Sequence, residues 1–176
     1  MMTVSKIVFI TGCSSGIGHA TAIELKNKGY RVICSARKAE DVQRLQREHF
    51  ECLQLDLADS NSIQQAVKDL LALTGGHVDV LFNNAAFGQP GAVEDLSREA
   101  LRNQFESNFF GTHELTNLLI PIMRQQGHGR IIYNSSILGF VAMKFRGAYN
   151  ASKFALEGLA DTASGITRDR YSYCTD

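Results

Sequence analysis

The amino-acid sequence predicts an α/β fold in which helices cover both faces of a parallel sheet. Three observations support this prediction. Short apolar segments show no polar alternation, as is typical of strands that are buried on both faces. A segment with helical character follows each of them along the chain. A glycine-rich turn separates the first strand-like segment from the first helix-like one. The 176 residues are enough for one domain with a substantial core.

Five segments are expected to form the sheet. They are residues 6–11, 31–36, 51–56, 78–83 and 130–135. Helices are expected at residues 16–28, from an N-cap at Ser60 to Gly75-Gly76, at about 98–126 with a kink at Pro121, and at 148–163. Right-handed crossovers between such elements give a doubly wound, Rossmann-like sheet in a three-layer α/β/α sandwich. Its ligand site lies at the carboxyl ends of the strands.

Composition excludes several classes of partner. The net charge is zero and the basic residues are not clustered, so we expect neither nucleic acid nor an anionic membrane to bind. The longest apolar stretches fall short of the ~20 residues that a membrane helix needs. The segment before the first strand leaves no room for a signal peptide, so the expected location is cytoplasmic.

The cysteines and histidines indicate neither disulfides nor a metal. The four cysteines, at positions 13, 34, 52 and 174, lie far apart and form no C-x-x-C pair. Cys34 and Cys52 lie in apolar runs and are expected to be reduced core residues. The five histidines are scattered, and none has a second ligand at metal spacing, so no metal is predicted.

The turn after the first strand has the composition of a phosphate-binding loop. It reads Thr11-Gly12-Cys13-Ser14-Ser15-Gly16-Ile17-Gly18. Its glycines let the backbone approach a pyrophosphate, and the helix behind it offers free N–H groups and a positive dipole end. We expect a dinucleotide to bind Gly12, Ser14, Ser15, Gly16, Ile17 and Gly18. Taken alone, these glycines are equally compatible with a tight turn that binds no ligand.

The end of the second strand indicates which dinucleotide binds. NAD-binding proteins usually carry a carboxylate there, which accepts a hydrogen bond from the ribose 2′-OH. This chain instead reads Ser35-Ala36-Arg37-Lys38, with no acidic residue. Arg37 can hold a 2′-phosphate through its planar guanidinium, so we predict NADP(H). Lys38 can also be interpreted as a solvated residue at the start of a helix.

Tyr149 and Lys153 are a candidate acid–base pair. Residues four apart in a helix lie on one face, so Lys153 can reach under the Tyr149 ring. A phenol exchanges protons poorly at neutral pH, and a nearby ammonium favours its ionised form. The Y-x-x-x-K spacing alone is common by chance and usually marks an ordinary surface pair.

Together these motifs resemble those of the short-chain dehydrogenases/reductases. The resemblance runs from Lys6 to about Thr162, with the motifs in the family order. After the third strand, Asp56 matches the family residue expected to contact the adenine, and Leu57 follows it. Asn83-Asn84-Ala85-Ala86 stands in place of N-N-A-G. Asn108 in the long helix and Ser136 after the fifth strand complete the resemblance. It implies that Asp56, Leu57, Asn84 and Ala85, with Tyr149 and Lys153, contact the cofactor.

The same resemblance implies catalytic roles. Tyr149 would be the general acid in reduction and the general base in oxidation, and Lys153 would assist it and hold the nicotinamide ribose. Ser136 would hydrogen-bond the substrate oxygen. Asn108 would hold a water that relays protons through Lys153. Ser135 competes with Ser136 for its role, and the spacing to Tyr149 favours Ser136.

The substrate is expected to be a small apolar carbonyl compound or alcohol. Residues 86–93 and 137–147 would form the mouth of the site, and their side chains are mostly apolar, although they could equally belong to the core. The motifs resemble those of hydroxysteroid, retinol and bacterial aldehyde reductase members without selecting one substrate. Ala86 replaces a family glycine, at a cost of about 1 kcal/mol if its φ is positive.

The last residues depart from the family pattern. Residues 1–162 form the nucleotide-binding and catalytic domain, whereas residues 163–176 are polar, contain Gly165 and show no apolar period. We expect an irregular tail, a sheet without the last strands of the family fold, and an exposed apolar edge on the fifth strand. One hypothesis is that the tail is read out of frame.

The sequence is also compatible with functions other than hydride transfer. A truncated chain without a substrate lid excludes water poorly, which favours a catalytically impaired or silent NADP-binding protein. The retained Ser136, Tyr149 and Lys153 favour an enzyme. A nucleotide-sugar epimerase shares Y-x-x-x-K but usually has a G-x-x-G-x-x-G turn. The family's homo-oligomers use two long helices, so a homo-oligomer through these helices is a further expectation.

Overall fold

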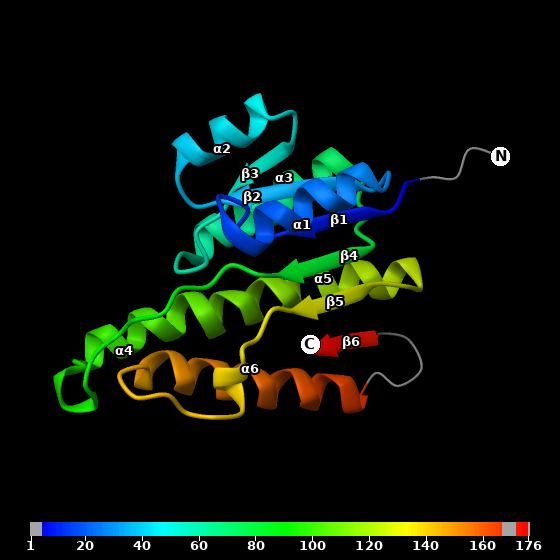
Figure 1. Ribbon diagram of the computed structural model, residues 1–176. Coiled ribbons are helices and arrows are strands. Elements are labelled where there is room, and N and C mark those ends of the chain that lie inside the picture. The colour runs from blue at the N-terminus through cyan, green and yellow to red at the C-terminus, as the bar shows by residue number, and fades with distance from the viewer. Residues whose placement is uncertain (1–4, 167–171, 176) are drawn as a thin grey trace.

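The computed structural model describes residues 5–166 and 172–175, and the side chains of residues 5–163. Its centre is a six-stranded sheet of order β3-β2-β1-β4-β5-β6, in which every neighbouring pair is parallel. The strands are β1 (Ile7–Ile10), β2 (Arg31–Ala36), β3 (Glu51–Gln54), β4 (Val80–Asn83), β5 (Arg130–Tyr133) and β6 (Ser172–Thr175). The strand order reverses at β1, as expected for a doubly wound fold. The predicted Rossmann-like architecture is therefore confirmed (Figure 1).

Helices cover both faces of this sheet. They are α1 (Gly16–Asn27), α2 (Ala39–Arg47), α3 (Ser60–Thr74), α4 (Arg98–Phe105), α5 (Thr112–Gln126) and α6 (Gly147–Ile166), with short turns η1 (Val93–Asp95) and η3 (Ile137–Gly139). Residues of α1 and α2 share one apolar cluster with the sheet, and residues of α3, α5 and α6 share the other. Within the described chain, no helix is long and apolar enough to cross a membrane.

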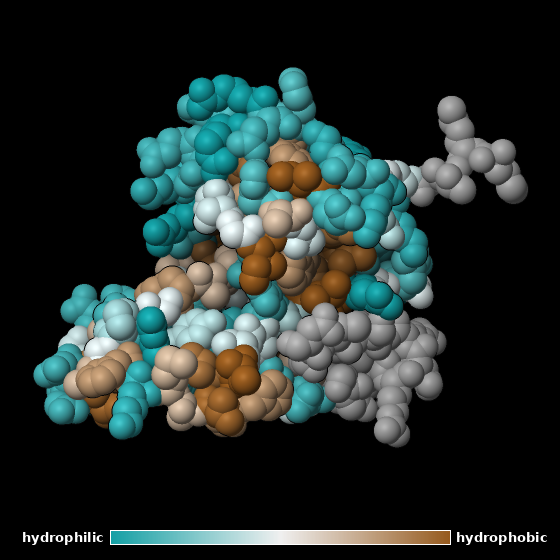
Figure 2. Space-filling view, viewed as in Figure 1, coloured by the Kyte–Doolittle hydropathy of each residue, from teal (hydrophilic) through white to brown (hydrophobic). Residues whose placement is uncertain are grey.

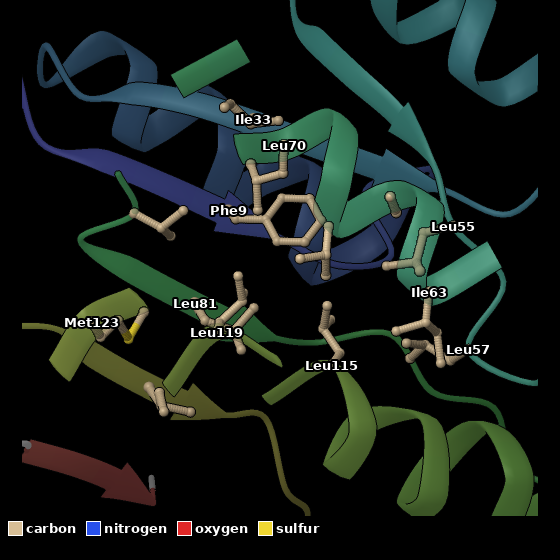
Figure 3. Packing of buried hydrophobic residues seen from close by; sticks show 14 of the residues in the cluster. Phe9, Ile33, Leu55, Leu57, Ile63, Leu70, Leu81, Leu115, Leu119 and Met123 are labelled. Atoms are coloured by element: carbon tan, nitrogen blue, oxygen red, sulfur yellow. The ribbon is translucent and has the colours of Figure 1, made fainter. Parts of the chain in front are cut away.

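Alternate residues of the central strand supply the two cores. Ile7 and Phe9 belong to the cluster under α3 and α5, whereas Val8 and Ile10 belong to the cluster under α1 and α2. Phe9 is fully buried and points from the sheet toward Leu70 of α3 (Figure 3). Burying such a side chain stabilises the fold by roughly 1.5–3 kcal/mol. The strands thus lack polar alternation because both faces are covered.

The cysteines described by the structure fit their predicted role. Cys34 and Cys52 are buried free thiols on adjacent positions of β2 and β3, and Cys13 is a third buried free thiol beside them. The side chain of Cys174 lies outside the described residues.

The ends of α3 confirm one predicted boundary and correct the other. Asp59, rather than Ser60, is the N-cap, because its side chain accepts a hydrogen bond from the Asn61 amide at 2.9 Å. Ser60 is already the first helical residue. Gly75 ends the helix in the left-handed conformation with φ +66°, as predicted.

The long helix predicted at residues 98–126 is interrupted by a π-helical segment. This segment, η2, covers Glu106–Gly111 and joins α4 to α5 without a loop. Gly111 lies so close to the Leu57 carbonyl that a side chain there would collide with it. Pro121 lies inside α5, and the π-helical segment precedes that helix. Such π segments often occur at functional sites.

The structure corrects the prediction of an irregular tail. Helix α6 continues through Gly165 to Ile166, and residues 172–175 form β6 beside β5. The free edge of β5 offers unpaired N–H and C=O groups, and an extended segment that contains Tyr173 and Thr175 can satisfy them. The cost of one helical glycine, about 1 kcal/mol, is easily exceeded by tertiary contacts. The predicted exposure of the β5 edge was therefore also wrong.

Candidate functional site

Hydrogen bonds join the carboxyl ends of β1, β4 and β5. The Thr11 hydroxyl accepts from the amides of Asn84 and Ala85, each at 2.9 Å. The Asn84 side-chain amide donates to the carbonyls of Thr11 and Gly12 at 2.9 and 3.1 Å. The side-chain oxygen of Asn84 accepts from the Asn134 side-chain amide at 2.9 Å. The glycine turn is thereby fixed to the two neighbouring strands.

The glycines of this turn are required by close packing. Gly12 has φ +72°, and a Cβ atom there would lie 2.8 Å from the Ala85 Cα. A Cβ atom on Gly18 would collide with the Gly12 carbonyl oxygen. The N-cap residue of α1, Ser15, makes no side-chain capping bond, so the side chain leaves the first-turn amides free for an anion. This geometry fits the predicted phosphate loop.

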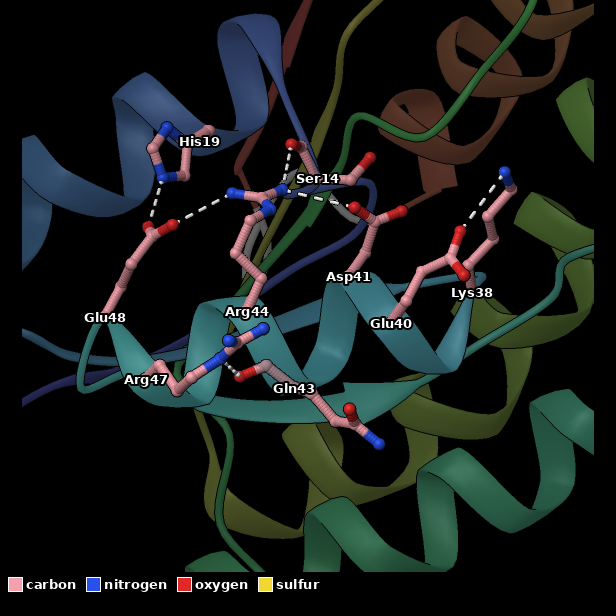
Figure 4. Close-up of polar contacts among 9 residues, drawn as sticks. All are labelled: Ser14, His19, Lys38, Glu40, Asp41, Gln43, Arg44, Arg47 and Glu48. Carbon is pink, nitrogen blue, oxygen red and sulfur yellow. Dashed lines mark hydrogen bonds and ion pairs between the residues drawn. The ribbon is translucent and has the colours of Figure 1, made fainter.

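Arg44 of α2 holds the outer side of the same turn (Figure 4). Its guanidinium donates to the Ser14 carbonyl and pairs with Asp41 at 3.3 Å and Glu48 at 2.9 Å. His19 contacts the second oxygen of Glu48 at 2.7 Å, and this contact, together with Arg44, lowers the pKa of the Glu48 carboxyl. Arg44 could not be predicted from the sequence, because nothing in the spacing shows that α2 reaches back to the turn.

A cleft of about 420 Å³ opens at this edge of the sheet. Most of the residues predicted to bind the cofactor line it. They are Gly12, Ser14, Ser15, Ile17, Arg37, Asp56, Leu57, Asn84, Ala85, Tyr149 and Lys153. Gly16 and Gly18, which shape the turn, do not line it, and neither do Asn108 and Ser136. Segments at the ends of the five strands β1 to β5, together with α6, therefore meet around one space.

Arg37 and Lys38 differ in their surroundings. Arg37 lines the cleft, and its carbonyl accepts from the Gln54 side chain at 3.0 Å. Among the described residues, none forms an ion pair with the Arg37 guanidinium. Lys38 is exposed and pairs with Glu40 at 3.4 Å. The interpretation of Lys38 as a solvated residue is thus supported, whereas Arg37 is placed to meet an anion in the cleft.

Tyr149 and Lys153 come together on the inner face of α6. Lys153 is 2% exposed, and its ammonium donates to the Asn134 carbonyl at 2.7 Å and lies 5.7 Å from the centre of the Tyr149 ring. Burial lowers the pKa of Lys153 to about 8, against the opposing charge of the buried Glu157. The predicted acid–base pair therefore has an ammonium beside a phenol at the base of the cleft.

The two candidate serines occupy different positions. Ser135 lines the cleft, and its buried hydroxyl has no hydrogen-bond partner within the described chain. Ser136 caps η3, where its oxygen accepts from the Leu138 amide at 3.1 Å. That bond uses an acceptor site of the Ser136 hydroxyl and leaves its proton available for donation.

Asn108 supports the loop after β4. The Asn108 side chain accepts from the Phe87 amide at 3.1 Å and donates to the Phe87 carbonyl at 2.9 Å and the Ser152 hydroxyl at 3.2 Å. Gln104, which the sequence analysis missed, is fully buried and binds the Phe87 carbonyl and the Gln89 amide. Both side chains bond the backbone of the loop after β4, and Asn108 also bonds Ser152, so Asn108 does not line the cleft.

A second cleft of about 430 Å³ adjoins the first. The two share Ala86, Phe87 and Tyr149. The rest of the second lining is Gly88, Leu138, Met143 and Arg146, of which Arg146 carries the charge. Positive φ among described non-glycine residues occurs at positions 49 and 145, so Ala86 avoids the strained backbone that its substitution for glycine could have required.

The two segments predicted to form the mouth of the site are in contact. The Gly91 amide donates to the carbonyl of Phe145, and Gly91 forms a bridge to Arg146. Apolar side chains gather over η3 and the loop that leads to α6 (Figure 2). They include Ile137, Phe140, Val141 and Met143, all more than half exposed. They are therefore surface residues rather than core.

The chain is similar in sequence to known proteins over most of its length. Residues 6–167 match the sequence model of the family described as short chain dehydrogenase. The uncharacterized oxidoreductase YbbO of Escherichia coli is 44% identical over 158 residues, which cover 90% of this chain and 59% of that protein. Human retinol dehydrogenase 8 is 37% identical over 172 residues, covering 92% of this chain and 54% of that protein. The chain spans less than two thirds of the length of these relatives.

Solved structures show the same fold. A short-chain dehydrogenase from Streptomyces avermitilis superposes with a TM-score of 0.92 at 35% identity, covering 98% of this chain and 65% of the other. A 3-ketoacyl-(acyl-carrier-protein) reductase from Brucella melitensis, solved with NADH, superposes with a TM-score of 0.88 at 23% identity, covering 94% of this chain and 71% of the other.

Proposed function

The chain belongs to the short-chain dehydrogenase family, and we propose that it transfers hydride between NADP(H) and an apolar aldehyde, ketone or alcohol. One observation carries this proposal: Tyr149 lines both clefts, with the Lys153 ammonium 5.7 Å from its ring. A proton donor thus stands where a dinucleotide in the first cleft would meet a substrate in the second.

The first cleft fits a dinucleotide. The glycine turn offers an anion the free amides of α1, and Gly12 has no room for a side chain beside the strand ends. In our proposal Asp56 and Leu57 hold the adenine end, and Asn84, Ala85 and Lys153 hold the nicotinamide end. When bound, the nicotinamide supplies or accepts the hydride. The family binds nicotinamide dinucleotides, and the choice of the 2′-phosphorylated form rests on Arg37.

The residues of this chain handle the proton. In reduction the Tyr149 hydroxyl donates its proton to the substrate oxygen as hydride reaches the carbonyl carbon, and the phenolate is stabilised by the Lys153 ammonium. A serine hydroxyl donates to the same oxygen as negative charge develops there. Solvent protons reach the phenolate through Lys153 and a water held near Asn108. In oxidation the same groups act in reverse.

The second cleft favours an apolar substrate. Its uncharged lining, Phe87, Leu138 and Met143, would desolvate a hydrocarbon chain, and Arg146 adds one cationic contact at its edge. Two relatives carry names that agree with this class, human retinol dehydrogenase 8 and a 3-ketodihydrosphingosine reductase of Bacteroides thetaiotaomicron, 38% identical over 157 residues.

A second candidate is a protein that binds NADP(H) without turning it over. It is favoured by the exposure of Ile137 and Phe140, 74% and 63%, because an active site needs such side chains covered to exclude water. One titration and one assay distinguish the candidates. Both predict that NADPH binds more tightly than NADH, but only the enzyme oxidises NADPH when retinal-like or long-chain aldehydes are added.

A further inference from the structure

Three metal-ligating side chains meet at the edge of the sheet opposite the cofactor cleft. Asp79 and His77 lie just before β4, and His128 lies just before β5. The Nε2 atoms of His77 and His128 lie 3.1 and 2.9 Å from the same oxygen, Oδ1 of Asp79. All three candidate ligand atoms lie within 4.8 Å of one another.

Asp79 is fixed in place by the neighbouring strand. Its side chain is 9% exposed, and Oδ2 accepts from the Ile7 amide at 2.7 Å. Asp79 therefore presents Oδ1 toward the two histidines, with its other oxygen already bonded.

The position of His128 favours a cation between its ring and Asp79. Its Nδ1 lies 3.3 Å from the Gln126 carbonyl, and its Nε2 lies 2.9 Å from Asp79 Oδ1. Both partners only accept, and a neutral ring carries one N–H, so one of its two nitrogens faces an acceptor with a lone pair. Two acceptors at this distance repel unless a proton or a metal ion lies between them. An imidazole that donates Nδ1–H to a carbonyl and offers Nε2 is also the usual arrangement of a metal-bound histidine.

Gln126 holds the two histidine-bearing turns together. Its side-chain oxygen accepts from the Val78 amide at 2.9 Å, and its nitrogen donates to the carbonyls of Val78 and His128 at 3.0 and 3.2 Å. Val78 lies between His77 and Asp79 in the chain. The relative position of all three ligands is therefore set before any ion binds, which lowers the ordering cost of binding.

We propose that His77 Nε2, Asp79 Oδ1 and His128 Nε2 bind one divalent transition-metal ion, with water completing the coordination. Two imidazoles and a carboxylate suit zinc, whose bonds to nitrogen and oxygen are about 2.0–2.2 Å long. The ligand atoms are already close enough for one ion after small shifts of the exposed rings. Side-chain exposures of 39% and 58% for His77 and His128 leave an entry path and room for water.

The sequence could not indicate this site. His77 and Asp79 are two residues apart, but His128 approaches them only because β4 and β5 are neighbours in the sheet. The ion would join the turns before these two strands, on the side of the sheet away from Tyr149. The proposal is therefore independent of the proposed hydride transfer.

Calorimetric titration of the complete, chelator-treated chain with zinc chloride tests this site. We expect one equivalent of zinc to bind, and cobalt(II) to give visible d–d absorption at the same stoichiometry. Asp79→Asn keeps an acceptor for the Ile7 amide and offers an amide N–H to the histidines, so it preserves the hydrogen bonds while removing the charged ligand. It should weaken zinc binding by at least about tenfold, as should His128→Gln.

The matched control is His113→Gln, which removes a half-buried histidine of α5 that contacts Asn117, away from the three proposed ligands. It should leave zinc binding unchanged. Zinc should also raise the melting temperature of the parent chain and of His113→Gln, but not of the two ligand variants. If Asp79→Asn does not fold, zinc binding by His128→Gln, a substitution at an exposed position, tests the proposal. Absence of one-equivalent binding, or equal binding by parent and His128→Gln, would overturn the proposal.

Discussion

The Lys153 ammonium donates a hydrogen bond to the Asn134 carbonyl at 2.7 Å. This contact ties α6 to the carboxyl end of β5, and Asn134 in turn donates to Asn84 beside the glycine turn. The residues proposed to handle the proton and those proposed to hold the cofactor thus belong to one continuous hydrogen-bonded assembly. A substitution that breaks this assembly at Lys153 or at the glycine turn should affect both cofactor binding and turnover.

The burial of Lys153 makes the stability of the fold depend on pH. The pKa of this group is lowered from 10.5 to about 8, so the folded chain releases the proton at a lower pH than the unfolded chain. The cost of the buried ammonium is fully present below pH 8 and is relieved between pH 8 and 10.5, by up to about 3 kcal/mol. Lys153→Met, which lacks this charge, should be the more stable chain at pH 7.

Urea unfolding at pH 7 and pH 10 measures this difference. The advantage of Lys153→Met over the parent should shrink as the pH rises, because only the parent is relieved of a buried charge. A difference in unfolding free energy that stays constant across this range would show that the ammonium carries no such cost.

Arg37 should determine the preference for the 2′-phosphate. Replacing it with glutamine removes a charged donor to a dianion, worth about 1.5–3 kcal/mol, so NADPH affinity should fall about ten- to a hundredfold while NADH affinity hardly changes. Lys38→Gln is the matched control, because Lys38 already pairs with Glu40 on the surface. Fluorescence titration measures both affinities; an equal loss for the two cofactors in Arg37→Gln would contradict the assignment.

The two serines can be separated by single alanine substitutions. If Ser136 donates to the substrate oxygen, Ser136→Ala should lower kcat about a hundredfold or more, with NADPH affinity unchanged. Ser135→Ala should then have a much smaller effect on kcat. The opposite order would assign the role to Ser135, whose unpartnered hydroxyl lines the cleft.

Asn108 should act through the backbone of Phe87 rather than through the substrate. Asn108→Leu leaves the Phe87 amide and the Ser152 hydroxyl without this partner, and it should lower the free energy of unfolding by about 1–3 kcal/mol. Gln104→Leu is a comparison variant that disturbs the same loop, because Gln104 bonds the Phe87 carbonyl and the Gln89 amide. We expect both to raise KM, and only Asn108→Leu to change the pH profile of kcat; identical profiles would leave Asn108 without a part in proton relay.

Much of the fold could be predicted because local patterns dominate it. The strand before the glycine turn, β1, is a continuous apolar run, and Gly75 marks a helix end that the structure confirms. The tail could not be predicted, because its secondary structure depends on a partner: the edge of β5 supplies hydrogen bonds to residues 172–175 that their own composition does not reveal.

The candidate site was predictable where chemistry depends on spacing along one element. Tyr149 and Lys153 are one helical turn apart, and the glycine turn is contiguous in sequence. Arg44, Gln104 and Arg146 were missed because their roles arise from packing between distant segments. Asn108 was found by resemblance, but the structure directs its side chain to the Phe87 backbone.

The central claim is that Tyr149 protonates the substrate oxygen while NADPH delivers hydride to the carbonyl carbon. The direct measurement is incubation of the chain with NADPH deuterated at the transferable C4 position and a long-chain aldehyde, followed by mass analysis of the alcohol. We expect deuterium on the carbinol carbon. We also expect the rate to fall at least about a hundredfold in Tyr149→Phe, with NADPH affinity retained. Absence of deuterium from the alcohol, or an undiminished rate in Tyr149→Phe, would contradict it.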